Sequence, residues 1–85
     1  MNIPLVEPKF LGTKVLTCGL TMTTEVNQYQ VTVFTFYKNK TPIGHMYYTR
    51  GGDYRYEVFC DLRSEARRVN SEDEAALWLI ERMPS

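Results

Sequence analysis

The sequence predicts an α+β fold: an antiparallel sheet of about four strands with one C-terminal helix packed on one face. Apolar and polar residues alternate through much of the chain up to residue 63, which is typical of half-buried strands. Breaks containing Gly, Pro or Asn separate these segments, and residues 71–83 carry a strong helix-start signal. Because 85 residues suffice for one small domain, we expect residues 1–85 to form a single domain.

An irregular arm and two strands are expected in the N-terminal half. Residues 1–12 contain two prolines and a glycine and predict the irregular N-terminal arm. A strand is predicted over residues 14–22, where alternate residues form an apolar face: Leu16, Cys18, Leu20 and Met22. A polar break at residues 23–28 precedes a second strand over residues 29–38, which is rich in β-branched and aromatic residues and apolar on both faces.

Two further strands are expected to form a hairpin. The first covers residues 43–50 and follows Pro42, which cannot donate to a strand ladder and therefore belongs at the loop end. The Gly-Gly dipeptide at residues 51–52 adopts positive φ values readily and predicts a tight turn. The second strand covers residues 53–63, and residues 64–70 are ambiguous between a short strand and a connection.

The C-terminal helix is predicted over residues 71–83. Ser71 and Glu74 match a capping box, in which the Ser71 hydroxyl accepts from the Glu74 N–H and the Glu74 carboxylate returns to the Ser71 N–H. One stripe of the helix is expected to pack on the sheet: Ala75, Trp78, Leu79 and Met83. Leu77 and Ile80 lie away from this stripe, and one helix cannot cover all of the apolar surface, so either the N-terminal arm or a second protein covers the rest; we interpret these two as candidate interface residues.

The charge balance and the N-terminus bound the class of protein. Ten basic and ten acidic residues give zero net charge; residues 1–70 hold nine Lys or Arg against six Asp or Glu, and residues 71–85 hold one base against four acids. Zero net charge removes the simplest electrostatic argument for a nucleic-acid partner. The chain shows neither a secretion signal nor a membrane-spanning segment, so we expect a cytoplasmic protein without membrane contact, whose Cys18 and Cys60 are free thiols.

Residues suited to catalysis or metal binding are sparse. A metal site needs three or four converging Cys, His or carboxylate ligands, and the chain has one histidine, His45, and two separated cysteines. Glycine-rich phosphate loops and the nucleophile elbow are both absent. We therefore expect a protein that is not an enzyme, with no metal, no cofactor and no small-molecule substrate.

Tyrosine and arginine concentrate around the predicted hairpin, and they make it the candidate binding surface. The leading hypothesis is a small protein-binding or regulatory module, a homodimer or an accessory or inhibitor protein of phage or bacterial type, because Tyr, Phe and Arg are enriched in protein interfaces. The candidate binding residues are Tyr48, Arg50, Tyr54, Arg55, Phe59, Arg63, Arg67 and Arg68. An ordinary exposed sheet face explains these residues about equally well, since Tyr is a strong strand former and alternating charges suit a solvated face.

Nucleic-acid binding through the same surface is the alternative, since Arg pairs with phosphates and aromatic rings stack on unpaired bases. Three antiparallel strands followed by Ser-x-x-Glu-Ala-x-x-Trp resemble the arm-type DNA-binding domain of tyrosine recombinases; the matching positions are Ser71, Glu74, Ala75 and Trp78. That resemblance implies a sheet that enters the major groove of DNA. It covers about a dozen residues and a hairpin pattern, those domains are usually basic, and we do not assign the chain to that family.

Overall fold

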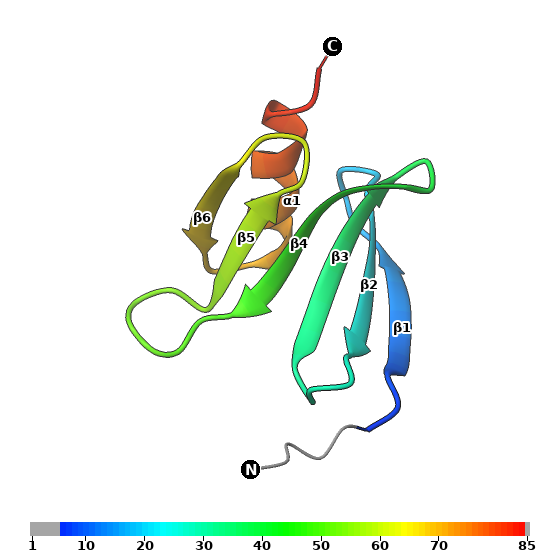
Figure 1. Cartoon of the computed structure of the whole chain (residues 1–85). Coiled ribbons are helices and arrows are strands. Elements are labelled where there is room, and N and C mark those ends of the chain that lie inside the picture. Colours follow the sequence, from blue (N-terminus) through cyan, green and yellow to red (C-terminus); the bar gives the residue numbers. More distant parts are fainter. Residues whose placement is uncertain (1–5, 85) are drawn as a thin grey trace.

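Within residues 6–84, six antiparallel strands form one sheet in which each strand pairs with its neighbours in sequence (Figure 1). The computed structural model describes residues 6–84. Its elements are β1 (Lys9–Val15), β2 (Thr21–Val26), β3 (Thr32–Lys38), β4 (Thr41–Tyr48), β5 (Tyr56–Cys60), β6 (Glu65–Val69) and α1 (Glu72–Glu81). The α+β class, the antiparallel sheet and the C-terminal helix agree with the sequence prediction, whereas the expected number of about four strands was wrong.

One additional strand comes from a turn inside the segment that was predicted as a strand over residues 14–22. The N–H of Leu16 donates to the Leu20 carbonyl at 2.8 Å, and the N–H of Gly19 donates to the Leu16 carbonyl at 2.9 Å. Leu16 and Leu20 are buried on either side of this turn. Apolar residues therefore alternate along the sequence as in a single strand, although the chain reverses direction between them. Residues 9–12 of the expected arm therefore belong to β1, and residues 1–5 lie outside the described part.

The polar segment expected to be a break forms strand β2. Its threonines suit a strand, and it is held on both sides, with Thr23 opposite Thr13 of β1 and Thr35 of β3. Asn27 then closes the turn to β3, because its side-chain oxygen accepts from the N–H groups of Tyr29 and Val31 at 2.9 and 3.1 Å. This turn delays the start of β3 to Thr32.

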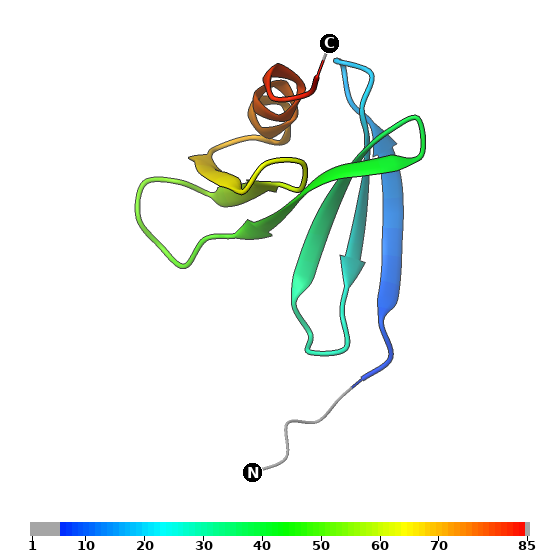
Figure 2. The same cartoon turned by 45° about the horizontal axis from the view of Figure 1, so that its top comes forward.

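Strand β4 bends the sheet into two halves. A two-residue turn, Asn39 and Lys40 with φ values of 49° and 71°, leads into it from β3. The register of the β3–β4 pairing shifts between Phe36, which pairs with Gly44, and Tyr37, which pairs with Pro42. Pro42 lies near the loop end of β4, as expected. In Figure 2 the half β1–β3 and the half β4–β6 diverge, and the bend between them lies along β4.

The β4–β5 connection is longer than the expected Gly-Gly turn. It spans residues 49–55, and the N–H of Thr49 donates to the Arg55 carbonyl at 3.0 Å across its base. Gly51 and Gly52 both have positive φ values. The strand after the loop covers only Tyr56–Cys60, and the ambiguous segment that follows it supplies the sixth strand, β6.

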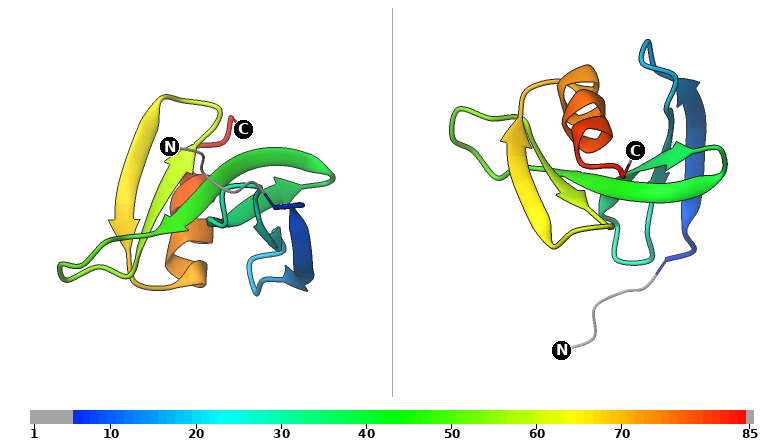
Figure 3. Two further views of the ribbon diagram at one scale, coloured as in Figure 1. Left: turned by 60° about the horizontal axis from the view of Figure 1, so that its bottom comes forward. Right: turned by 90° about the horizontal axis from the view of Figure 1, so that it is seen from above.

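Helix α1 lies on the inner side of the bent sheet, as the two views in Figure 3 show. The Ser71 hydroxyl accepts from the Glu74 N–H at 3.0 Å as expected, but the Glu74 carboxylate accepts from the N–H of Asn70, at 3.1 Å, rather than from that of Ser71. The helix ends at Glu81, two residues earlier than predicted. It buries Ala75, Ala76, Trp78 and Leu79 against both halves of the sheet in one apolar core.

The two apolar side chains predicted to lie away from the packed stripe of the helix, Leu77 and Ile80, differ in exposure. Leu77 is 55% exposed, which agrees with its expected place on the outer side of the helix. Ile80 is half-buried and packs against the core, as does Met83 after the helix. Only Leu77 is thus an exposed apolar residue of α1.

Candidate functional site

The eight candidate binding residues lie in separate places. Four of them lie at or beside the β4–β5 loop: Tyr48, Arg50, Tyr54 and Arg55. Phe59 and Arg68 lie on the outer face of the sheet, because Tyr56, Val58 and Cys60 of β5 are buried on the helix side and Arg68 pairs with Glu57. Arg67 lies on the helix side, opposite Val58, and Arg63 lies in the β5–β6 turn. The structure therefore does not bring the eight residues together into one surface.

The loop group is anchored to the sheet by aromatic contacts. The Tyr48 ring stacks on Tyr56, with ring centres 5.4 Å apart, and meets the edge of Phe34 at 5.3 Å. The N–H of Arg55 donates to the Asn70 side chain at 2.9 Å. Tyr48 and Tyr54 remain exposed. This end of the sheet is an ordered surface whose arginine side chains extend into solvent.

On the outer face, a second aromatic group surrounds His45. Its ring stacks on Phe59, with ring centres 5.1 Å apart, and Tyr47 meets both rings edge-on. The His45 Nδ1 atom lies 2.7 Å from a carboxylate oxygen of Asp61. Among residues 6–84, no group of three or more His, Cys, Asp or Glu residues is arranged to hold a metal ion.

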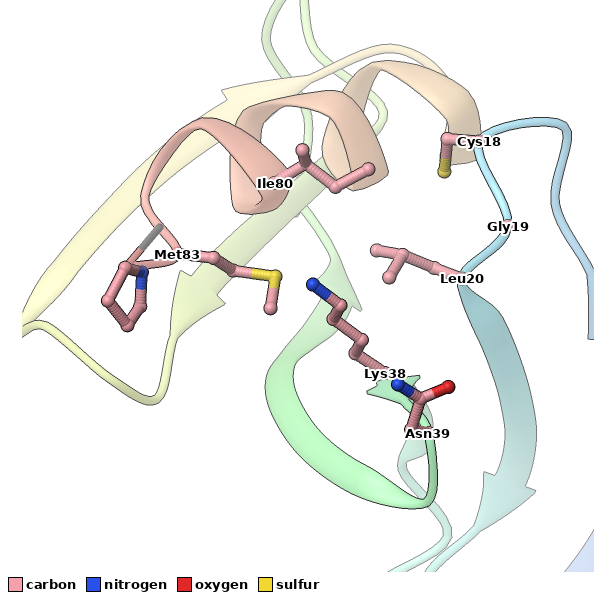
Figure 4. Close-up of a pocket in the computed structure, with 8 residues that line it drawn as sticks. Cys18, Gly19, Leu20, Lys38, Asn39, Ile80 and Met83 are labelled. Atoms are coloured by element: carbon pink, nitrogen blue, oxygen red, sulfur yellow. The ribbon is translucent and has the colours of Figure 1, made fainter.

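Several hollows border the helix, and two of them lie beside its C-terminal half. The larger, of about 440 Å³, lies where the β1–β2 turn, the β3–β4 turn and the end of α1 meet (Figure 4). Apolar side chains and one cation line it: Cys18, Leu20, Ile80, Met83 and Lys38. The smaller, of about 240 Å³, brings Arg67 of β6 beside Leu77 of α1, two candidate residues that the sequence analysis placed in different sets.

The strongest contrast on the molecule lies between the two edges of the sheet. Strand β1 exposes Phe10 at 62%, Leu11 at 52% and Val15 at 73%. Strand β6, the opposite edge, exposes mainly charged residues: Glu65, Arg67 and Arg68, with Ala66 between them. Charged side chains and bulges are common devices that keep an edge strand from pairing with other chains; β1 carries two lysines and one bulge, but it also exposes three large apolar side chains, which β6 does not.

The apolar edge is held in a defined position. The N–H of Val6 donates to the Gln28 carbonyl at 3.1 Å, and the Lys14 ammonium lies 2.9 Å from the Glu72 carboxylate at the start of α1. The hydrogen bond to Glu72, with the negative charge of that carboxylate, raises the pKa of Lys14 above its ordinary value. A bulge interrupts the pairing with β2 between Phe10 and Gly12. Strand β1 is therefore a fixed edge and not a loose arm.

Sequence reasoning missed this edge. Residues 1–12 were interpreted as an irregular arm because of their prolines, and Val15 was assigned to a strand that ran on to residue 22. The available signal was the run KFLGTKV, in which apolar and β-branched residues lie on both sides of one glycine.

No protein-family model matches the chain, and no similar protein is found among curated sequences or among solved structures. Within residues 6–84, no helix has the length and apolar character needed to cross a membrane.

Proposed function

We propose that the chain is a small protein-binding module with an accessory or regulatory role, and that it docks a partner along edge strand β1. The observation that carries this proposal is the run of exposed apolar side chains on that edge: Phe10, Leu11 and Val15. An edge strand also presents N–H and C=O groups without strand partners, so an extended segment of another protein gains main-chain hydrogen bonds and apolar contacts together.

The exposed apolar surface of these three side chains favours binding, because a partner that covers it removes it from water. Removing apolar surface from water contributes about 25 cal/mol per Å², and exposed apolar patches that gather on one element mark interaction sites more often than isolated residues do. The ion pair between Lys14 and Glu72 fixes one end of β1 before any partner arrives. A preorganised edge loses less conformational entropy on binding.

The Arg- and Tyr-bearing loop, residues 49–55, is a secondary candidate surface for the same module. Nucleic-acid binding has less support, because the candidate arginines lie on two faces and at two ends of the sheet, and Arg68 lies 4.0 Å from the Glu57 carboxylate. The six strands also depart from the three-stranded pattern of the arm-type DNA-binding domains. A non-enzymatic role in the cytoplasm completes the proposal; it is supported by the absence of catalytic motifs in the sequence and by the free thiols of Cys18 and Cys60.

Capture of partners by the tagged chain from an extract of its source cells tests the role of β1. We expect Val15→Glu to remove the proteins that the wild-type chain retains, because the carboxylate would be buried at the interface. Leu77→Glu is the matched control, since Leu77 is also exposed but lies on α1. Retention of the same proteins by the Val15 variant, or their loss in the Leu77 variant alone, would show that β1 is not the docking element.

A further inference from the structure

We infer that the strand received by β1 is β1 of a second copy of this chain, paired antiparallel about a two-fold axis beside Thr13. The two sheets then continue into one another across the joined edges. This inference rests on the proposed function, because it names the partner of the same edge. It adds the identity of that partner and the register of the pairing.

Electrostatics permit this self-association. The chain has zero formal net charge, so two copies do not repel one another over a distance. The Lys14 ammonium on β1 is already paired with Glu72 of its own chain at 2.9 Å. A partner of strongly acidic character would find only two lysines on β1, Lys9 and Lys14, and one of them is occupied. A second copy offers the same apolar side chains that β1 itself exposes.

Face alternation restricts the register. Residues that lie opposite one another in a two-fold antiparallel pair share a face, so the axis must pass beside one residue rather than between two. An axis beside Lys14 would set two ammonium groups against each other, and like charges directly opposite are destabilising. An axis beside Gly12 would put the bulge at the centre of the pairing. Of the positions outside the bulge, Thr13 gives the longest overlap between the two copies of β1, and its side chain is exposed.

The Thr13 register also matches the apolar positions. Counting outward from Thr13 sets Lys14 opposite Gly12, so no lysine of β1 faces a lysine, and it brings Val15 of each copy close to Leu11, the bulged residue, of the other. Val15 and Leu11 are 73% and 52% exposed in the single chain, and the pairing would remove part of this surface from water by giving each side chain a cross-strand neighbour. In this register the two copies of β1 overlap over residues 11–15, a length of about 17 Å, which makes the interface small and the expected dissociation constant micromolar rather than nanomolar.

Sedimentation velocity over protein concentrations from about 1 µM to about 1 mM tests the second copy, a range that spans the affinities expected of a small interface. We expect a monomer that converts to a dimer as the concentration rises. Val15→Lys should shift the midpoint at least tenfold toward higher concentration, whereas the control Leu77→Lys should leave it unchanged. Far-UV circular dichroism confirms that each variant is folded.

Cross-linking at the two-fold axis tests the register, and its readout is the formation of a covalent dimer rather than the loss of an interaction. In the Cys18→Ser background, Thr13→Cys would place two thiols across the axis at a separation that a disulfide can span. We expect mild oxidation to convert most of this variant into a covalent dimer. The control is Ala66→Cys in the same background, since Ala66 is exposed on the other edge strand, β6, and should cross-link only by random collision.

The outcomes separate this inference from the proposed function. A chain that stays monomeric throughout, or a dimer that resists Val15→Lys and gives no more Thr13→Cys product than Ala66→Cys product, overturns the second copy. If β1-dependent capture from extract persists in that case, the docking edge stands with a different partner. If the chain is monomeric and capture does not depend on Val15, both proposals fail.

Discussion

At the scale of single residues, Gly44 sets how closely the helix approaches the sheet. A Cβ atom at this position would lie 2.7 Å from the Phe59 carbonyl oxygen of the neighbouring strand and 2.7 Å from a methyl group of Leu79 on α1. One of these obstacles is backbone and cannot move without shifting the β4–β5 pairing. Glycine is therefore required here for space, and its conformational freedom is not the reason.

Gly44→Ala is expected to lower the free energy of unfolding by about 3 kcal/mol, since overpacking a tight core contact costs this much. Gly51→Ala is the control: it also adds a methyl group, but into open space at a φ of 91°, and should cost only about 1 kcal/mol. Urea unfolding followed by Trp78 fluorescence measures both. Equal losses of unfolding free energy in the two variants would mean that the close contact of Gly44 with Phe59 and Leu79 does not exclude a methyl group there.

At the scale of elements, the sequence was informative where a local signal and the tertiary structure agree. Ser71 is followed by acids and an apolar stripe, and it begins α1 as expected. Between Leu16 and Leu20 the local pattern misled, because buried residues on both sides of a turn imitate a strand. The run KFLGTKV was a local signal for β1 as a strand, but its place at the edge of the sheet could not be predicted, because that place depends on β2 pairing along one side of it.

In the β3–β4 turn, Lys40 occupies a backbone conformation that its residue type disfavours. Asn39 and Lys40 both have positive φ values, a geometry that favours Asn followed by Gly. Lys40→Gly is expected to raise the free energy of unfolding by about 0.5 to 1 kcal/mol, because glycine adopts this conformation without steric strain. Chemical denaturation measures the change. The control Lys40→Ala removes the same charge without relieving the strain, and a comparable gain in both variants would assign the effect to charge instead.

At the scale of the whole molecule, the two halves of the bent sheet share one apolar core. Met22, Phe34 and Phe36 come from the β1–β3 half, and Val58 and Val69 come from the β4–β6 half. Helix α1 packs between them and covers both. The mainly charged edge of β6 and the apolar edge of β1 then lie at opposite ends of a continuous strand order, so the two edges of the sheet differ in the surface that they offer to other chains.

A shared core predicts that the halves unfold together. Trp78 is buried in α1, so its fluorescence reports on the helix and the β4–β6 half, whereas the loss of far-UV circular dichroism reports on the strands of both halves. We expect the two signals to give one coincident transition in urea at concentrations where the chain is monomeric. Because every strand pairs with its sequence neighbour, refolding should be fast, on the order of milliseconds in its main phase. A circular dichroism transition that precedes the Trp78 transition would show instead that β1–β3 unfolds independently, and that the chain is not one cooperative domain.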